Sequence, residues 1–162
     1  MGISRTSKIL KLMTAILFCQ VVGVVGSLFT YPSIQTWYAT VRKPDFTPPN
    51  WVFAPVWIIL FVLMGISAYL IWIKGLENKN IRIALLIFGI QLVLNGLWSF
   101  LFFGLQSPLY AFFEVIILWL VILLTITKFS KISKTAGLLL IPYIIWVSFA
   151  AILNFYIVRL NR

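Results

Sequence analysis

Long apolar runs alternate with short polar stretches along the whole chain. The runs cover residues 12–29, 51–73, 82–103, 110–127 and 135–158. Each run approaches the roughly 20 apolar residues with which an α-helix crosses a hydrocarbon core about 30 Å thick. Because lipid offers no hydrogen-bond partner to the backbone, each run has to be helical. The pattern predicts an all-α membrane protein, a five-transmembrane-helix bundle that forms a single domain over residues 1–162.

The overall composition supports lipid as the solvent of this chain. Hydrophobic residues make up 62% of the sequence and charged residues 10%, whereas a soluble domain carries roughly 25% charged residues. A chain of this length has room for one membrane domain and for no additional soluble catalytic module. The composition therefore excludes the soluble enzymes and the soluble binding modules.

The placement of basic residues predicts the orientation of the bundle. Nine of them lie at the N-terminus and around the stretches that follow the second and fourth runs: Arg5, Lys8, Lys11, Lys74, Lys79, Arg82, Lys128, Lys131 and Lys134. The opposite side carries four: Arg42, Lys43, Arg159 and Arg162. Since Lys and Arg concentrate in cytoplasmic loops, we expect a cytoplasmic N-terminus and a C-terminus outside. The net charge of +10 thus indicates the bilayer and its anionic headgroups as partners, and no nucleic acid.

One connection between the runs is long, over residues 31–50. It contains four of the seven prolines, Pro32, Pro44, Pro48 and Pro49. Proline restricts the backbone and lowers the entropy that a segment loses on ordering. Because long connections in compact domains often cover a site, we expect a lid here.

The residue types narrow the chemistry that the chain can perform. Histidine is absent, which removes the commonest metal ligand and the usual general base at neutral pH. Cys19 is the single cysteine, so neither an intrachain disulfide nor a cysteine zinc cluster can form. We expect no metal and no resident cofactor.

Three polar residues of the third run share one helical face. Gln91, Asn95 and Ser99 are spaced four apart, and Trp98 and Phe102 continue that face. Amide side chains within membrane helices often hydrogen-bond a neighbouring helix. The same side chains could instead form a pocket wall that hydrogen-bonds a ligand, and the spacing leaves both interpretations open.

Aromatic residues supply a second set of candidates. Trp37, Trp51 and Trp72 lie where indoles concentrate at the lipid headgroups. Trp57, Trp98 and Trp146 lie deeper in their runs, as does Phe61. A deep indole needs a partner for its N–H, so these residues are candidates for lining a flat aromatic pocket.

Three further features each allow a structural or a functional interpretation. Glu114 is the one acid inside a run; a hydrogen bond to a neighbouring helix is favoured over a proton relay. Leu153, Tyr156 and Arg159 satisfy a proposed cholesterol-binding pattern, which also describes an ordinary interfacial anchor. Gly23 and Ser27 have a spacing that allows close helix contact in a dimer.

Several motifs together resemble one family. The matching segments are Trp37-Tyr38, Lys43-Pro44, Thr47-Pro48-Pro49, Trp51, Ala54-Pro55-Val56-Trp57, Asn95, Trp98, Phe102-Phe103-Gly104, Ile141-Pro142-Tyr143, Trp146, Phe149-Ala150 and Leu153-Asn154. They occur in order over nearly the whole chain, and they resemble the TspO/MBR family of tryptophan-rich sensory proteins and translocator proteins. Glu114 stands where that family has an acidic residue, whereas Leu160 replaces an acidic residue of the animal members. The chain is therefore similar to the bacterial members.

The resemblance implies a five-helix, usually dimeric membrane protein whose pocket is capped by the first loop. Its ligands would be porphyrins and other tetrapyrroles, certain drugs and, in animals, cholesterol. Carried onto this sequence, the resemblance implies these pocket residues: Tyr38, Pro44, Trp57, Asn95, Trp98, Phe102, Trp146, Ala150 and Leu153.

The candidate residues and the family resemblance together indicate one expected function and two alternatives. We expect a homodimeric porphyrin receptor in a bacterial cell membrane, acting in tetrapyrrole sensing, transport or disposal. Gln91 and Asn95 would meet a polar edge of the ligand, and Arg42 or Lys43 a propionate. The first alternative is an enzyme that degrades protoporphyrin in light, with Trp57 and Trp146 in the catalytic role that the resemblance implies. The second is a lipid or sterol carrier that depends on Tyr156 and Arg159.

Overall fold

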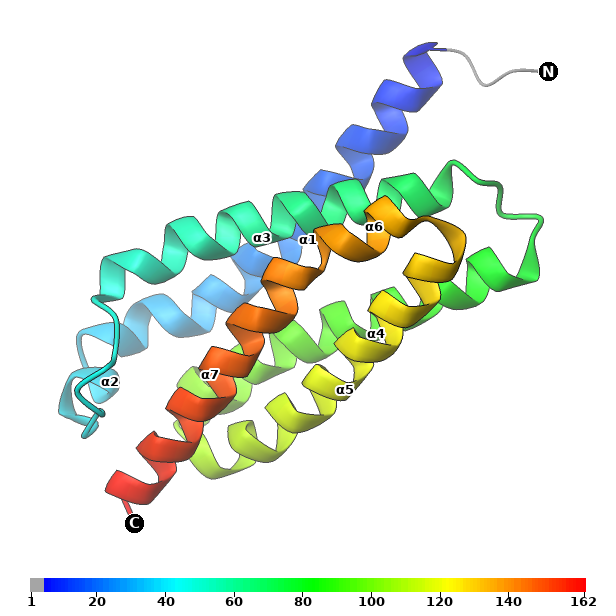
Figure 1. Ribbon diagram of the computed structural model, residues 1–162. Coiled ribbons are helices and arrows are strands. Elements are labelled where there is room, and N and C mark those ends of the chain that lie inside the picture. Colours follow the sequence, from blue (N-terminus) through cyan, green and yellow to red (C-terminus); the bar gives the residue numbers. More distant parts are fainter. Residues whose placement is uncertain (1–4) are drawn as a thin grey trace.

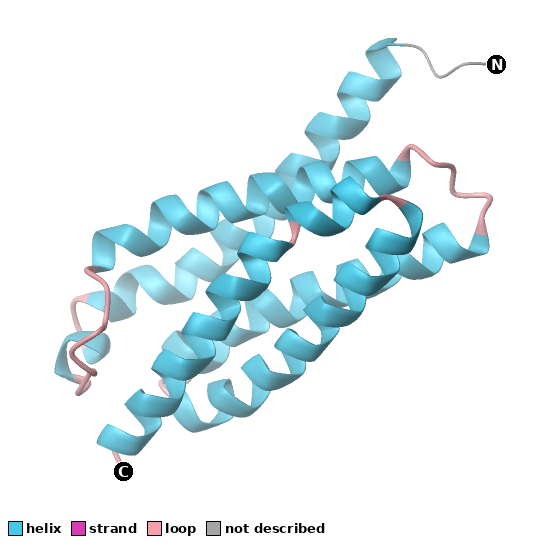
Figure 2. Cartoon of the chain, in the orientation of Figure 1, coloured by secondary structure: helices cyan, strands magenta, loops and turns pink. Residues whose placement is uncertain are grey.

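The computed structural model describes residues 5–162, and five helical segments in it are long and apolar enough to cross a membrane. The elements are α1 (Arg5–Ile34), α2 (Trp37–Thr40), α3 (Asn50–Trp72), α4 (Lys79–Ser99), η1 (Phe100–Gly104), α5 (Pro108–Ile132), α6 (Lys134–Leu139) and α7 (Ile141–Leu160). The described residues contain no strand, and the long helices lie side by side as a bundle (Figures 1 and 2). The predicted all-α fold with five membrane-spanning helices is confirmed.

The helices extend beyond the apolar runs from which they were predicted. The first is described from Arg5 to Ile34, so at both ends it extends past its apolar run at residues 12–29. As a consequence, the connection to α3 is shorter than residues 31–50. It comprises residues 35–49, which include the single turn α2, and we call this segment the lid.

Two of the spans are not uninterrupted α-helices. The third ends in the π-helical turn η1, in which the amide N–H of Leu105 donates to the carbonyl of Phe100 over 2.8 Å. The fifth is divided into α6 and α7 around Leu140. Pro142 lies in the first turn of α7, and a proline has no N–H to continue the hydrogen-bond ladder of the preceding helix.

Small and polar side chains hold the bundle together at close contacts. A Cβ atom placed on Gly65 of α3 would lie 2.5 Å from the Cα atom of Ile16 in α1, so the two helices cross almost backbone to backbone. Such crossings are typical of membrane helices, where packing replaces the hydrophobic effect. The buried hydroxyl of Ser67 donates to the carbonyl of Ala136 over 2.7 Å and ties α3 to α6.

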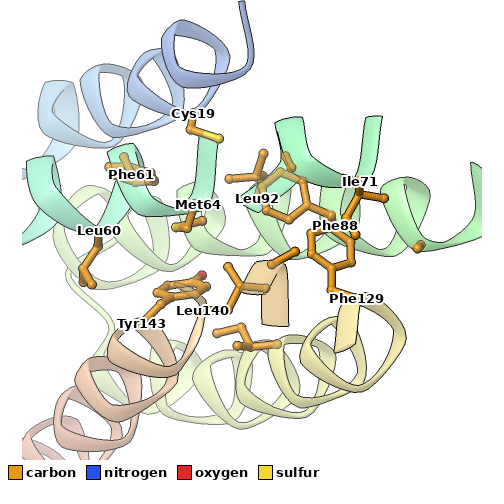
Figure 3. Close-up of a cluster of buried hydrophobic side chains, with 14 of the residues drawn as sticks. Cys19, Leu60, Phe61, Met64, Ile71, Phe88, Leu92, Phe129, Leu140 and Tyr143 are labelled. Carbon is orange, nitrogen blue, oxygen red and sulfur yellow. The ribbon is translucent and has the colours of Figure 1, made fainter. Parts of the chain in front are cut away.

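The interior between these contacts is an apolar core drawn from all the spans. Figure 3 shows Cys19 of α1 projecting into this core, together with Met64 of α3 and Leu92 of α4. Phe88 and Phe129 stack with ring centroids 5.6 Å apart and join α4 to α5. This core fills the half of the bundle away from the lid, and the other half encloses a cavity.

Candidate ligand-binding cavity

A cavity of about 410 Å³ lies between α1, α3, α4, α5 and α7 on the side of the bundle that the lid covers. Its volume falls within the roughly 300–1,000 Å³ of typical small-molecule sites. Most of its lining is apolar, with the amides of Asn95 and Asn154 among the polar exceptions. The cavity is therefore suited to an apolar ligand that is oriented by a few hydrogen bonds.

The structure brings together most of the residues predicted to bind a ligand. Those that line the cavity are Tyr38, Trp57, Phe61, Asn95, Trp98, Phe102, Trp146, Ala150 and Leu153. They come from the lid, from η1 and from three of the long helices, so segments far apart in the sequence meet at one site.

Pro44 and Gln91 do not line the cavity. The carbonyl of Pro44 closes a turn within the lid, accepting from the amide N–H and the hydroxyl of Thr47 over 3.0 and 2.7 Å. Gln91 is 1% exposed, and its Oε1 accepts from the hydroxyl of Tyr143 over 2.7 Å. Asn95, which does line the cavity, donates to the same hydroxyl over 3.1 Å. Of the two interpretations of this polar face, a link between helices holds for Gln91. Both a link between helices and a pocket wall hold for Asn95.

The tryptophans fall into two groups by the state of their indole N–H. Trp98 donates to Oδ1 of Asn154 over 3.2 Å, and Trp119 donates to the hydroxyl of Ser148 over 2.8 Å. Trp57 and Trp146 line the cavity, and no group of residues 5–162 accepts a hydrogen bond from either indole. Since a deep indole needs an acceptor, these two N–H groups are donors available to a ligand.

Aromatic rings hold both of these indoles in place. Trp57 stacks on Phe61 at 5.5 Å and meets Tyr143 edge to face at 6.2 Å. Trp146 meets Phe53 edge to face at 5.9 Å. Offset and edge-to-face arrangements are the favourable ones for aromatic pairs. The cavity walls therefore keep their flat faces without a ligand.

The lid is fastened to the bundle by aromatic and polar contacts. Phe46 packs edge to face against Tyr156 of α7 at 5.4 Å. The ammonium group of Lys43 lies 4.5 Å from the ring centroid of Tyr38, within the range of a cation–π interaction. Burial raises the pKa of Tyr38 above its ordinary value, so the phenol of the folded protein is neutral at neutral pH.

The remaining predictions have mixed outcomes. Glu114 is 6% exposed, and neither carboxylate oxygen has a hydrogen-bond partner among the described residues. The prediction of a hydrogen bond from Glu114 to a neighbouring helix was therefore wrong.

The cholesterol pattern is divided between two surfaces. Leu153 is buried at the cavity, whereas Tyr156 and Arg159 are exposed on the outside of α7.

The contribution of α1 was not foreseen from the sequence. Several of its residues line the cavity, among them Gly23, Gly26, Ser27 and Thr30. A Cβ atom on Gly23 would lie 2.6 Å from the ring of Phe61, so this glycine makes room for an aromatic wall within the same chain. The spacing of Gly23 and Ser27, which predicts a close helix contact, was the available signal in the sequence.

Comparison with known proteins identifies a matching family and several similar sequences. The model of the TspO/MBR family matches residues 15–160. The chain is 44% identical to the tryptophan-rich protein TspO of Chlorobaculum tepidum, over 95% of this chain and 98% of the relative. It is 50% identical to the protein of the same description from Archaeoglobus fulgidus, over 94% and 98%. It is 34% identical to the human translocator protein, over 85% and 82%. With five apolar helices and these matches, the chain is a multi-pass membrane protein that belongs to the TspO/MBR family.

Proposed function

We propose that the cavity binds a tetrapyrrole of the porphyrin type, and that the protein acts in sensing, transporting or disposing of such pigments. The observation that carries this proposal is the pair Trp57 and Trp146. Both are held by other aromatic rings at the cavity, and both keep a free indole N–H. A porphyrin is flat and apolar, and its polar edge can accept hydrogen bonds, so it matches this combination of walls and donors.

The lid adds a charge to this arrangement. Lys43 and Arg42 are neighbours in the segment that covers the cavity, and Lys43 lies against the cavity-lining Tyr38. A porphyrin propionate at the mouth of the cavity would meet a cation there, and a charge-assisted hydrogen bond is stronger than a neutral one. The ligand would then lie with its macrocycle inside and its carboxylates toward the lid.

The test is a titration of the purified protein with protoporphyrin IX in the dark, followed by quenching of tryptophan fluorescence. We expect saturable quenching. Trp57→Phe and Trp146→Phe keep a flat ring but lose the donor, so each should weaken binding by a few-fold, as expected for one hydrogen bond. Trp119→Phe is the matched control, because its N–H is bound to Ser148 and it does not line the cavity. Quenching that does not saturate would overturn the proposal.

Illumination of the same sample separates binding from the enzymatic alternative. If the protein uses light and molecular oxygen to oxidise the bound pigment, a new pigment spectrum should appear in the wild type and be lost in both Trp→Phe variants. A spectrum that bleaches at the rate of free pigment supports binding alone.

The sterol alternative rests on a different surface. Tyr156 and Arg159 lie on the outside of α7, so a sterol bound there should not compete with protoporphyrin for the cavity. Sterol binding that is lost in Tyr156→Ala or Arg159→Gln and is unaffected by protoporphyrin would favour the carrier.

We further propose a homodimer in a bacterial cell membrane, with the N-terminus in the cytoplasm and the C-terminus outside. The excess of basic residues at the N-terminal end of the bundle supports this orientation. Fluorescent-protein and alkaline-phosphatase fusions at the C-terminus test the orientation: phosphatase activity without fluorescence is expected. Native mass spectrometry tests the dimer.

A further inference from the structure

A second hollow lies at the end of the bundle away from the lid. It has a volume of about 330 Å³ and an almost wholly apolar lining. The lining residues are Thr14, Ala15, Phe18 and Cys19 of α1, Ala68 and Trp72 of α3, Leu76 of the following loop, and Leu85, Phe88 and Gly89 of α4. We call this hollow the α1/α3/α4 groove. It shares no lining residue with the cavity described above.

The groove is unfilled at its α4 wall. A Cβ atom placed on Gly89 would meet no other atom within 4 Å, whereas one on Gly65 or Gly23 would collide with a neighbouring helix or ring. At the rim, Phe18 is 62% exposed and Leu76 is 44% exposed. A groove that combines unfilled space with an exposed apolar rim is accessible to a chain-like apolar ligand from the surrounding bilayer.

The groove ends among positive charges. The ammonium group of Lys11 lies 5.5 Å from the ring centroid of Trp72, which is a lining residue. Lys74 follows Trp72 by two residues, and Arg82 precedes the lining residue Leu85 by three, about one helical turn. Glu77 is the one acidic side chain between α3 and α4. These three cations exceed the single acid, so this end of the groove carries a net positive charge.

We propose that the α1/α3/α4 groove holds one acyl chain of an anionic phospholipid, whose phosphate lies at Lys11 and Trp72. The apolar lining matches the acyl chain, and the unfilled space at Gly89 gives it room. The basic rim matches the phosphate, because Lys and Arg near the membrane surface attract anionic headgroups. The Trp72 indole adds a donor at the depth where tryptophan meets headgroups. This site is independent of the porphyrin proposal.

The experiment is lipid retention measured by native mass spectrometry. The full chain is released from nanodiscs that contain equal amounts of phosphatidylglycerol and phosphatidylcholine with identical acyl chains. We expect retained lipid to be mainly phosphatidylglycerol. Lys11→Gln should lower that preference by about fivefold, the effect of one basic residue near the surface. Because Lys11 lies near the exposed end of α1, this change leaves the core intact.

A second pair of variants separates groove filling from general changes in apolarity. Gly89→Leu places a side chain in the unfilled space and should abolish retention of the lipid. Val93→Leu enlarges an apolar side chain one turn further along α4, at a position that is 72% exposed, and should leave retention unchanged. Thermal unfolding of both variants checks that the bundle is intact.

Three results would overturn the proposal. The first is equal retention of the two lipids by the wild type. The second is equal retention by Gly89→Leu and Val93→Leu. The third is a change of oligomeric state in Gly89→Leu without a change in bound lipid, which would assign the groove to a second copy of the chain.

Discussion

Arg42 in the lid and Asn161 at the end of α7 bind each other through two hydrogen bonds. The amide N–H of Arg42 donates to Oδ1 of Asn161 over 3.0 Å, and Nδ2 of Asn161 donates to the carbonyl of Arg42 over 2.8 Å. The same Nδ2 also donates to the carbonyl of Ile157 over 2.8 Å, which holds the amide against its own helix. One side chain thereby fastens the segment that covers the cavity to a helix that lines it.

Removal of this link should make the lid easier to open. Asn161→Ala deletes both hydrogen bonds while the cavity lining stays complete. We expect protoporphyrin to enter and leave faster, with each rate rising by a few-fold, since an exposed hydrogen bond contributes about 0.5–1.5 kcal/mol. Stopped-flow fluorescence measures both rates. Asn80→Ala, in the first turn of α4 at the other end of the bundle, is the control, and identical rates in Asn161→Ala and the wild type would contradict a latch.

The Tyr143 hydroxyl should stabilise the core through its two amide partners. Tyr143→Phe leaves Oε1 of Gln91 buried without a donor, and leaves Asn95 without its acceptor. A buried polar group without a partner costs about 1–3 kcal/mol. We expect a lower midpoint of unfolding in sodium dodecyl sulfate titrations. The double variant Tyr143→Phe/Gln91→Leu should recover part of the loss, because it removes the orphaned acceptor; an additive loss would contradict the linkage.

Two glycines should respond oppositely to the same substitution. Gly65→Ala places a Cβ atom 2.5 Å from the Cα of Ile16, so α1 and α3 must separate. Overpacking of this kind costs about 1–3 kcal/mol. Gly89→Ala meets no atom within 4 Å and should be neutral or mildly stabilising, because alanine is the better helix former. Thermal unfolding in detergent compares the two variants, and equal destabilisation would refute the close crossing.

Asn154 should hold Trp98 in its place in the cavity wall. Its Oδ1 accepts from the indole N–H, and its Nδ2 donates to the carbonyl of Pro108 over 2.8 Å. Asn154→Leu removes both hydrogen bonds. We expect a loss of stability of about 1 kcal/mol, since each hydrogen bond between membrane helices contributes roughly 0.6 kcal/mol, and weaker protoporphyrin binding from the displaced ring. Ser148→Ala, which frees Trp119 outside the cavity, should lower stability alone; an equal effect on binding would count against a specific role.

Tyr38 should make the folded state less stable at alkaline pH. Burial raises its pKa in the folded protein, whereas an unfolded tyrosine titrates near pH 10. Above that pH the unfolded state releases a proton that the folded state retains, so the free energy of unfolding falls as pH rises through the folded pKa. Tyr38→Phe should remove this component of the pH dependence. The exposed Tyr31→Phe is the control, and parallel pH profiles for wild type and Tyr38→Phe would exclude the effect.

Much of the architecture could be predicted from the sequence, because the bilayer imposes it. The length and apolarity of the runs determined the number of membrane helices, and the charged stretches between the runs located their ends. Depth within a run indicated the indoles that line the cavity, as Trp57 and Trp146 illustrate. The extent of the lid was overestimated, since α1 continues to Ile34 past the end of its apolar run.

Tertiary structure alone decided which face of each helix turns inward. A soluble helix reveals its buried face by alternation of apolar and polar residues, but a membrane helix is apolar on all sides, so its rotation leaves little trace in the sequence. Gln91 and Asn95 share a face, yet one links helices and the other also lines the cavity. Gly23 became part of a wall, and Gly89 was left beside empty space, only because α1 crosses α3 and α4 where it does. Close packing between helices, which depends on side chains distant in sequence, is the physical reason that the cavity and the groove emerge only from the folded bundle.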